Sequence, residues 1–386
     1  MDIYKKYANV IYNIAKEIEP ILDYRFEGND LLQKTELVFA QKVNSNNPII
    51  VNSGTMGLYA CLLAYNIEEG CEILLPVNIC QSIVNVIIER RLIPIFVDID
   101  SNLCMKIEDL KRKITLNTKM VIFVHSYGFP MRLDEIIQYC RLRGIICVED
   151  CAQAPFSMLN GVRVGKLGDV AIYSFGQNKP ISAGGGGMVC ASQKEDAMRI
   201  RIAAREGAIN YPEFLDLGMC LSINNLHALL LYYWLINIES IMAARDERIR
   251  KYHEVFEGHV EYIGKLKDIT YGNYNMFHKF ILKMPYLLNK EKYDCFFEKL
   301  YKDNALARQL VQPSLVQLPY KVNYVREYWK KMGRFDLVQN MYIGSERVQN
   351  TYIYMSTHHL ITLDMIEHVG SDIKKLLNEN SAIKKK

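Results

Sequence analysis

Short apolar runs alternate with amphipathic segments from about residue 48 to residue 190. The apolar runs have the length and composition of buried strands, and they predict seven of them: Ile49–Val51, Glu72–Leu75, Ile93–Val97, Met120–Val124, Ile145–Glu149, Val170–Ser174 and Gly187–Cys190. Helical spacing of apolar residues between these runs predicts helices such as Thr55–Tyr65, Gln81–Arg90 and Leu133–Arg143. This alternation indicates βαβ units, and therefore an α/β fold with a mainly parallel sheet and helices on both faces.

The pattern changes in the last third of the chain. A charged helical segment, Ile236–Phe256, leads into a region that mixes strands and helices, such as Tyr262–Met284 and Thr362–Asn378. A chain of 386 residues, half of them apolar, is long enough to form two cores. We predict a large domain of residues 1–245 that begins with a helical segment, and a smaller α+β domain of residues 246–386.

Charge and hydropathy exclude several classes of partner. The net charge is +4, and the only basic cluster is the tail Lys384–Lys386. A nucleic-acid-binding surface needs concentrated basic charge. The first residues lack the apolar core of a signal peptide. The longest apolar stretch, Leu226–Ala243, contains polar residues and predicts a buried or interfacial helix rather than a membrane span. We therefore expect a cytoplasmic protein that binds neither nucleic acid nor membranes.

The ten cysteines form no C-x-x-C pair. Four of them, Cys61, Cys140, Cys147 and Cys190, lie in apolar runs, as buried thiols do in a reducing compartment. We expect no metal site.

Lys179 ends the segment Ser174-Phe175-Gly176-Gln177-Asn178-Lys179 and is followed closely by Gly184–Gly187. Asp150 ends an apolar strand upstream, and we expect it at the same sheet edge as Ser174 because carboxyl ends of parallel strands meet there. A lysine amine that can form a Schiff base, with a carboxylate that keeps a pyridine nitrogen protonated, suits pyridoxal phosphate (PLP). Alone, Lys179 could be an ordinary surface lysine, and Asp150 an ordinary helix cap.

Three further segments could complete such a site. Ser53-Gly54-Thr55 follows a strand and opens a helix, where backbone N–H groups can hold a phosphate, although Ser and Thr are also ordinary N-caps. Gln153 would lie on the same side as Asp150 if a helix began there, and could contact the cofactor's phenolic oxygen or ring. His125 ends another strand, so a substrate contact and a structural role are equally open.

Together these segments resemble the DegT/StrS family of PLP-dependent sugar aminotransferases. The matching segments follow the family's order: Glu36…Phe39-Ala40, Ser53-Gly54-Thr55, Gly70-Cys71-Glu72, Leu75-Pro76, Phe96-Val97-Asp98, His125-Ser126-Tyr127-Gly128, Glu149-Asp150-Cys151-Ala152-Gln153-Ala154 and Ser174-Phe175…Lys179-Pro180…Gly184…Gly186-Gly187. The resemblance covers about residues 25–250 well and the C-terminal third weakly.

The resemblance implies a fold-type-I aminotransferase that works as a homodimer. Lys179 would hold PLP and move the proton, and Asp150 would pair with the pyridinium nitrogen. Gln153 would contact the ring or its oxygen, and Ser53, Gly54, Thr55 and Ser174 would hold the phosphate. The donor would be glutamate or glutamine, and the acceptor a keto sugar, typically a nucleotide-linked 3-keto or 4-keto deoxysugar. Lys179 argues against the family's dehydratase branch, where histidine replaces it.

The chain departs from the family at three places. No aromatic residue occurs in Asn78-Ile79-Cys80 to stack on the cofactor ring. Gly218-Met219-Cys220-Leu221-Ser222 lacks the asparagine and arginine of the family's corresponding segment, and Gly185 stands where a glutamate is common. These changes leave alternatives open: an aminotransferase for a cyclitol ketone or a sugar phosphate, another PLP reaction such as desulfuration, or a non-catalytic regulatory or partner protein with this fold.

Overall fold

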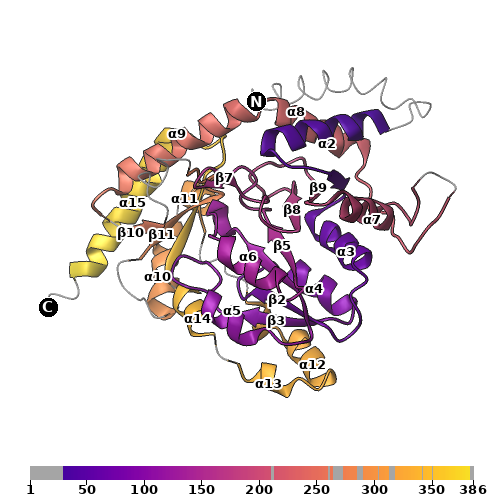
Figure 1. The fold of residues 1–386 in the computed structure, drawn as a ribbon. Coiled ribbons are helices and arrows are strands. Elements are labelled where there is room, and N and C mark those ends of the chain that lie inside the picture. Colours follow the sequence, from indigo (N-terminus) through magenta and orange to yellow (C-terminus); the bar gives the residue numbers. More distant parts are fainter. Residues whose placement is uncertain are drawn as a thin grey trace.

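The computed structural model describes residues 29–209, 213–259, 261–263, 273–284, 290–302, 304–312, 318–340, 342–349 and 351–382. The helical segment expected at the start of the chain lies mostly outside this range. The described chain forms two large sheets with their surrounding helices (Figure 1), and a small two-stranded sheet of β6 (Met158–Leu159) and β7 (Val162–Arg163).

The larger sheet has seven strands in the order β1-β9-β8-β5-β4-β2-β3. They are β1 (Pro48–Val51), β2 (Glu72–Pro76), β3 (Ile93–Val97), β4 (Thr118–Val124), β5 (Ile146–Asp150), β8 (Val170–Ser174) and β9 (Gly187–Ala191). Only β9 runs antiparallel to its neighbours. All seven predicted strands are confirmed, and so is the mainly parallel sheet.

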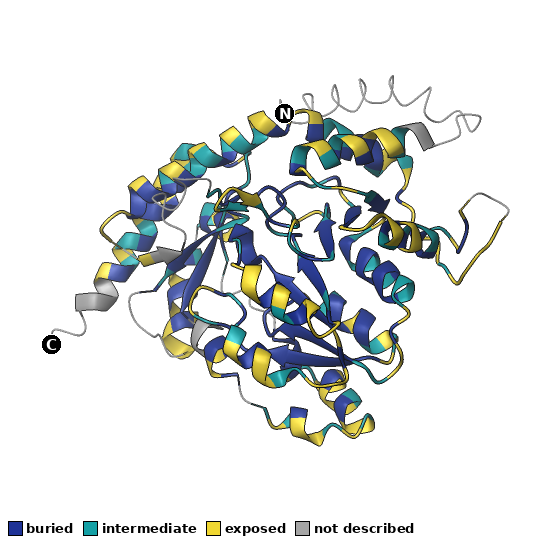
Figure 2. Ribbon diagram, in the orientation of Figure 1, coloured by how far each residue is buried: buried dark blue, intermediate teal, exposed yellow. Residues whose placement is uncertain are grey.

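Helices cover this sheet, as the alternation of elements predicts. They are α2 (Asn29–Val43), α3 (Gly54–Ala64), α4 (Gln81–Glu89), α5 (Ile107–Lys113), α6 (Asp134–Arg141) and α7 (Lys194–Ala204). In β8, Val170 and Ile172 belong to one apolar core, while Ala171 and Tyr173 belong to another. Successive side chains of a strand point to opposite faces, so β8 is buried from both sides. Figure 2 shows the central strands in the colour of buried residues.

The smaller sheet is antiparallel and has the order β10-β11-β13-β12. Its strands are β10 (Glu261–Ile263), β11 (Lys279–Lys283), β12 (Val311–Gln312) and β13 (Tyr352–Ser356). Helices α10 (Lys290–Tyr301), α11 (Ala305–Leu310) and α15 (Leu363–Ala382) accompany it, and α15 packs against α9 (Ile238–Phe256). This mixture agrees with the predicted α+β character. The predicted boundary between residues 245 and 246 falls inside α9, and the division into two domains stays a prediction.

One predicted helix is two helices. The apolar stretch from Leu226 to Ala243 is divided between α8 (Asn225–Ile236) and α9, which are bent by 69° relative to each other. Asn237 stands at the bend, and its side-chain amide donates to the carbonyl oxygen of Tyr233. Within the described residues no single helix has the length and composition of a membrane span, and α8 and α9 meet that test only as a bent pair.

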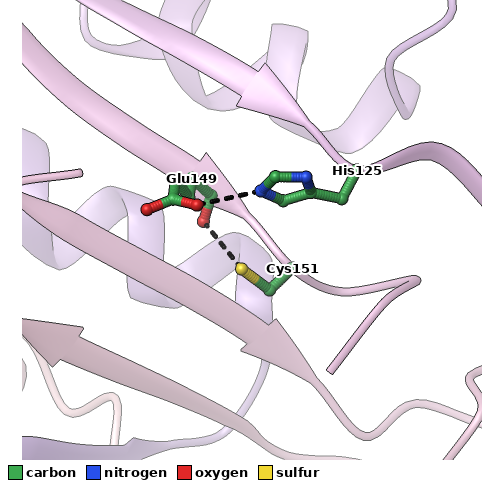
Figure 3. Close-up of side chains that lie close together, drawn as sticks. All are labelled: His125, Glu149 and Cys151. Atoms are coloured by element: carbon green, nitrogen blue, oxygen red, sulfur yellow. Dashed lines mark hydrogen bonds and ion pairs between the residues drawn. The ribbon is translucent and has the colours of Figure 1, made fainter. Parts of the chain in front are cut away.

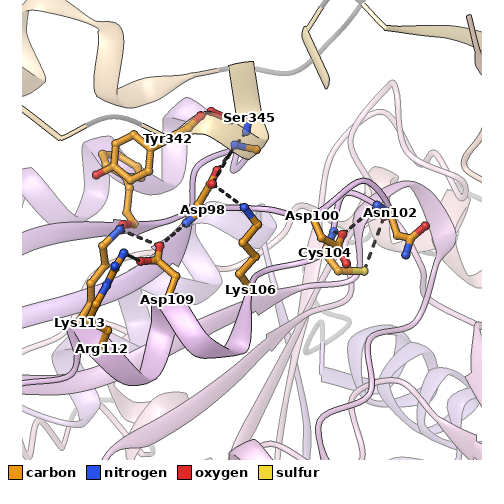
Figure 4. Close-up of polar contacts among 12 residues, drawn as sticks. Asp98, Asp100, Asn102, Cys104, Lys106, Asp109, Arg112, Lys113, Tyr342 and Ser345 are labelled. Atoms are coloured by element: carbon orange, nitrogen blue, oxygen red, sulfur yellow. Dashed lines mark hydrogen bonds and ion pairs between the residues drawn. The ribbon is translucent and has the colours of Figure 1, made fainter. Parts of the chain in front are cut away.

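The C-terminal region covers the β2–β3 edge of the large sheet through α12 (Asn323–Lys331), α13 (Phe335–Val338) and α14 (Ile343–Gln349). The indole N–H of Trp329 donates to the carbonyl oxygen of Pro94 at 3.0 Å, and Arg334 pairs with buried Glu72 at 2.6 Å. The carboxylate of Asp98 accepts from the backbone N–H groups of Gly344 and Ser345 (Figure 4). These contacts cover the edge strand β3, which would otherwise be open to pairing with another chain. They also hold the C-terminal helices against the ends of the strands.

A buried hydrogen-bond network around a carboxylate lies beneath the carboxyl ends of β4 and β5 (Figure 3). The Glu149 carboxylate is only 1% exposed and accepts from the backbone N–H groups of Gly165, Leu167 and Gly168. His125 donates from Nε2 to the same carboxylate at 3.0 Å, because its Nδ1 accepts from the N–H of Met131. Burial alone would raise the pKa of Glu149, but these donors hold it below its ordinary value.

The donor atoms of His125, Glu149 and Cys151 lie within 4.8 Å of one another, a spacing that a metal ion could use. Their hydrogen bonds point to a structural role instead. Both ring nitrogens of His125 have protein partners, and the thiol of Cys151 lies 3.7 Å from the carbonyl oxygen of Glu149. The Glu149 carboxylate accepts hydrogen bonds from four protein groups, and it thereby fixes the 165–168 turn to the end of β5.

Replacing Glu149 by Gln should lower the free energy of unfolding by about 3 kcal/mol, because the amide group cannot accept from all the N–H groups around it. The loss should be full above about pH 4.3, the ordinary pKa of glutamate. It should shrink as the pH falls and the wild-type carboxylate is protonated. Urea denaturation of both proteins measures this difference.

The matched control is Glu69→Gln, because the side chain of Glu69 is 67% exposed. Its unfolding free energy should stay within about 0.5 kcal/mol of wild type. Equal stabilities of the Glu149→Gln variant and the control would contradict the role assigned to the network.

Candidate active site

Three neighbouring strands end at one edge of the sheet and bring together three of the residues singled out in the sequence. Asp150 ends β5, Ser174 ends β8, and His125 directly follows β4. The backbone N–H of His125 donates to the carbonyl oxygen of Asp150 at 3.1 Å. The expectation that these residues share a sheet edge is therefore met.

The loop between β8 and β9 carries Lys179 back over this edge. The backbone of Phe175 makes two hydrogen bonds across the base of the loop. Its N–H donates to the carbonyl oxygen of Gly186 at 2.9 Å, and its carbonyl oxygen accepts from the N–H of Ala183 at 3.0 Å. Inside the loop, the N–H of Lys179 donates to the carbonyl oxygen of Gly176 at 3.0 Å. The half-buried lysine lies near enough to Asp150 for its charge to act on that carboxyl group.

Asp150 combines burial with an open acceptor. Burial raises the pKa of its carboxyl group, while Lys179 and the N–H of Ala152 oppose that rise. The N–H of Ala152 donates to Oδ1 at 2.9 Å, and no residue in the described part of the chain donates to Oδ2. This carboxylate lacks a full set of donors, so a cation or protonated nitrogen beside it would be favourable.

Gln153 lies in a turn, because no helix begins after Asp150. The expected position on a first helical turn is therefore wrong. The side chain is nevertheless oriented: its Oε1 accepts from the backbone N–H of Tyr127 at 2.8 Å. This contact assigns the amide and leaves its NH₂ group as the donor for a ligand.

The start of α3 lies beside this edge and could hold an anion. Ser53 caps the helix by accepting from the N–H of Met56 at 3.1 Å. The first N–H groups of a helix have no acceptors within the helix, and they carry the positive end of its dipole. A Cβ atom on Gly54 would lie 3.1 Å from the Cβ of Ser174, and one on Gly187 only 2.5 Å from the nitrogen of Gly54. Glycine at both positions thus allows three backbone segments to converge on the helix start.

The hydroxyl group of Thr55 forms a chain of contacts with α4. It lies 2.9 Å from the hydroxyl of Ser82, which lies 3.2 Å from the thiol of Cys80. Cys80 is exposed at the start of α4, in the segment that lacks the stacking aromatic. At this departure from the family, the structure therefore has the thiol of Cys80 at the start of α4, linked through Ser82 to Thr55 at the start of α3.

His227 explains a second departure. A Cβ atom on Gly185 would lie 2.8 Å from Nδ1 of His227, so this imidazole occupies the space that a larger residue at position 185 would need. The ring is held from α8, where the side chain of Asn224 accepts from the N–H of His227 and lies 3.3 Å from its Nδ1. The absence of the common glutamate is thus paired with a histidine that fills its place.

Two histidines lie near the sheet edge, and only His125 was expected there from the sequence. His125 is 1% exposed, and its ring is used by the Glu149 network beneath the edge. His278 was not predicted from the sequence. It directly precedes β11 and lies beside Lys179. The available signal was a histidine directly before an apolar strand, but the sequence does not show what that strand faces.

The residues present fit pyridoxal phosphate. An amine, a half-buried carboxylate with an open oxygen and a helix start rich in N–H donors lie along one edge. They match the aldehyde, the ring nitrogen and the phosphate of that cofactor. Gln153, three residues after Asp150, adds an oriented NH₂ donor.

The comparisons with known proteins agree with this fit. Residues 14–374 match the model of the DegT/DnrJ/EryC1/StrS aminotransferase family. GDP-perosamine synthase of Escherichia coli O157:H7 is 38% identical over 42% of this chain and 45% of its own length. UDP-N-acetyl-3-dehydro-alpha-D-glucosamine 3-aminotransferase of Acidithiobacillus ferrooxidans is 29% identical over 60% of this chain and 63% of its own. The chain thus aligns with less than two thirds of either relative.

A solved structure from Streptococcus pneumoniae, described as "Putative sugar aminotransferase Spr1654" in its PLP-form, shares the fold. Its TM-score is 0.81 at 18% identity, and the match covers 94% of this chain and 96% of the other. Because the family model spans nearly the whole sequence, the chain belongs to the DegT/DnrJ/EryC1/StrS aminotransferase family, a family of enzymes whose cofactor is pyridoxal phosphate.

Proposed function

We propose that the protein transfers an amino group from an amino acid to the ketone of a sugar, in the biosynthesis of an amino sugar. The observation that carries this proposal is the placement of Lys179, Asp150 and the α3 start along one sheet edge. The two relatives above support the substrate class, because the name of each contains a nucleotide-linked sugar.

In this proposal each residue has a defined task. When bound, PLP supplies an electron sink for the carbon that loses or gains a proton. Lys179 would anchor the cofactor and carry that proton on its amine, and Asp150 would keep the ring nitrogen protonated. Gln153 would donate its NH₂ group to the cofactor's oxygen.

The phosphate would lie at the start of α3. Gly54 and Thr55 would donate backbone N–H groups, while Ser53 and Ser174 would shape the site and offer hydroxyls. His125 would act from beneath the edge, by holding Glu149 and the strand end that presents Asp150. Substrate contact by His125 would need the buried ring to become accessible.

The finer assignments belong to the same proposal. The donor would be glutamate or glutamine, and the acceptor a nucleotide-linked 3-keto or 4-keto deoxysugar. We also propose a cytoplasmic homodimer. An exposed apolar group on the 209–226 segment supports the dimer: Ile209, Phe214, Leu215, Leu217, Met219 and Leu226.

The visible absorption spectrum of the purified protein with added PLP tests this function. A band of lysine-bound cofactor that excess glutamate or glutamine converts to the amino form would establish the donor half-reaction. Mass spectrometry of products from keto sugar nucleotides, keto sugar phosphates and cyclitol ketones would then identify the acceptor. Binding of PLP without conversion by any amino acid would contradict an aminotransferase function.

Replacing Lys179 by Ala should abolish the lysine-bound band and reduce turnover by about 10³-fold or more, because the variant lacks the amine that would anchor the cofactor and carry the proton. Stopped-flow absorbance with the donor amino acid measures the loss. Lys119→Ala, at an exposed lysine on β4, should keep wild-type rates. Turnover within a few fold of wild type in the Lys179 variant would show that another lysine holds the cofactor.

Replacing Asp150 by Asn should reduce turnover by about 10²-fold to 10³-fold, the scale of removing one preorganised electrostatic partner. The cofactor-free variant should be as stable as wild type or more stable at neutral pH. Burial raises the pKa of Asp150, so the carboxyl group favours folding below its ordinary pKa of about 3.9 and disfavours it once ionised.

Thermal denaturation of the cofactor-free proteins at pH 7 and pH 4 measures this difference, which should narrow at the lower pH. Asp294→Asn, at an exposed position on α10, is the control. A large loss of stability at pH 7 in the Asp150 variant would assign this carboxylate a structural role.

A further inference from the structure

A histidine from the C-terminal part of the chain fastens the loop that carries Lys179. His278 directly precedes β11, and its Nε2 lies 2.7 Å from the carbonyl oxygen of Asn178, the residue before Lys179. A carbonyl oxygen only accepts, so Nε2 carries the proton and donates it. This single hydrogen bond joins the smaller sheet to the lysine loop.

The other ring nitrogen faces an acceptor. Nδ1 of His278 lies 3.5 Å from Oε1 of Gln153, and that oxygen already accepts from the N–H of Tyr127. Burial, reinforced by Lys179, Lys279 and Arg245, lowers the pKa of His278 well below its ordinary value. The ring is therefore neutral at neutral pH, and its one N–H proton, on Nε2, is used in the hydrogen bond to the Asn178 carbonyl oxygen. His278 has no free proton with which to act as an acid towards a substrate.

The backbone around His278 is fixed from several sides. Phe277 has a left-handed φ of 48°, an uncommon conformation for a bulky residue. The N–H of His278 donates to the carbonyl oxygen of Tyr127 at 2.9 Å. A Cβ atom on Gly128 would lie 2.5 Å from the nitrogen of Phe277, so this approach requires glycine. A strained conformation that several contacts maintain is typical of functional positions.

A buried guanidinium group supports the same turn. The side chain of Arg245 donates to the hydroxyl of Thr357 at 2.7 Å and to the carbonyl oxygen of Phe277 at 3.3 Å. The hydroxyl of Thr357 in turn donates towards the carbonyl oxygens of Phe277 and His278. Helix α9, strand β11 and the end of β13 thus hold the imidazole in one place. Its direction towards Asn178 is set before any ligand binds.

We propose that His278 is a positioning residue for Lys179, holding the lysine loop by its hydrogen bond to the Asn178 carbonyl. This inference rests on the proposed role of Lys179 as the cofactor lysine. Proton transfer depends on the lysine amine being within reach of the reacting carbon, and displacements of about 1 Å can cost about 10²-fold in rate. His278 would therefore affect turnover more than substrate affinity.

Two variants of the full-length protein test this proposal. His278→Leu removes the donor, whereas His278→Gln keeps an N–H group that can reach the Asn178 carbonyl. We expect kcat to fall by about 10-fold to 100-fold in the Leu variant with the KM for the donor amino acid changed less than about threefold. We expect the Gln variant to recover most of the loss. His368→Leu, at a histidine whose side chain is 65% exposed on α15, is the control and should match wild type.

Hydrogen exchange of the cofactor-free proteins gives a readout independent of activity. The N–H of Lys179, bonded to Gly176, should exchange about tenfold faster in the Leu variant, and peptides from the large sheet should be unchanged. Unchanged exchange in the loop, or a loosened loop with normal kcat, would overturn the proposal. Faster exchange throughout the protein, with no recovery in the Gln variant, would assign His278 a general structural role and also overturn it.

The ring tautomer in the wild-type protein provides a test that needs no variant. Nitrogen NMR of the cofactor-free protein should show the proton of His278 on Nε2, and a proton on Nδ1 would overturn the assignment. Failure of the proposed function is distinguishable from failure of this inference. If Lys179 does not hold the cofactor, the Lys179→Ala variant keeps its lysine-bound band, while the exchange and tautomer results still report on the loop.

Discussion

A carboxylate that stays charged inside the protein sets the geometry of the candidate site. Glu149 and Asp150 are consecutive in β5, so their side chains point to opposite sides of the sheet. Glu149 points into the interior, where His125 and three backbone N–H groups satisfy it. Those contacts fix the end of the strand, and Asp150 is thereby presented at the edge with one oxygen open. The fully buried carboxylate of Glu149, with its hydrogen bonds satisfied, thus positions the half-buried carboxylate of Asp150, which keeps one oxygen open.

The site also depends on the C-terminal third of the chain. His278 holds the lysine loop, and the cap that Asp98 gives to α14 ties the C-terminal helices to the strand ends. Trp329 and Arg334 close the β2–β3 edge beside them. The large sheet carries Asp150 and the loop that contains Lys179, and the smaller part of the molecule is joined to that loop by His278. Changes in the packing of β11 would therefore reach Lys179 through a short chain of hydrogen bonds.

The sequence was most informative where structure is local. Each predicted strand of the large sheet is present, because apolar runs of five or so residues between glycine-rich or polar turns leave little choice. The bend at Asn237 was missed, since an apolar composition continues across it. A helical turn was expected after Asp150 because an acid at a strand end commonly caps a helix. Here Asp150 accepts only from the N–H of Ala152 in a turn.

Non-local contacts account for what the site analysis omitted. Nothing in the sequence near residue 278 indicates the carbonyl of Asn178, one hundred residues away, or the left-handed conformation of Phe277. Glu149 is part of the segment that resembles the family, but its partners are backbone N–H groups of the 165–168 turn, and residue types do not show where backbone N–H groups point. Lys179 and Asp150 could be singled out from the sequence, whereas the residues that hold them in place could not.

In the proposed function, Lys179 is the residue that binds the cofactor. The most direct measurement is borohydride reduction of the protein incubated with PLP, followed by peptide mapping by mass spectrometry. We expect one pyridoxyl group per chain, on the peptide that contains Lys179. A label on another lysine, or no stoichiometric label, would contradict it.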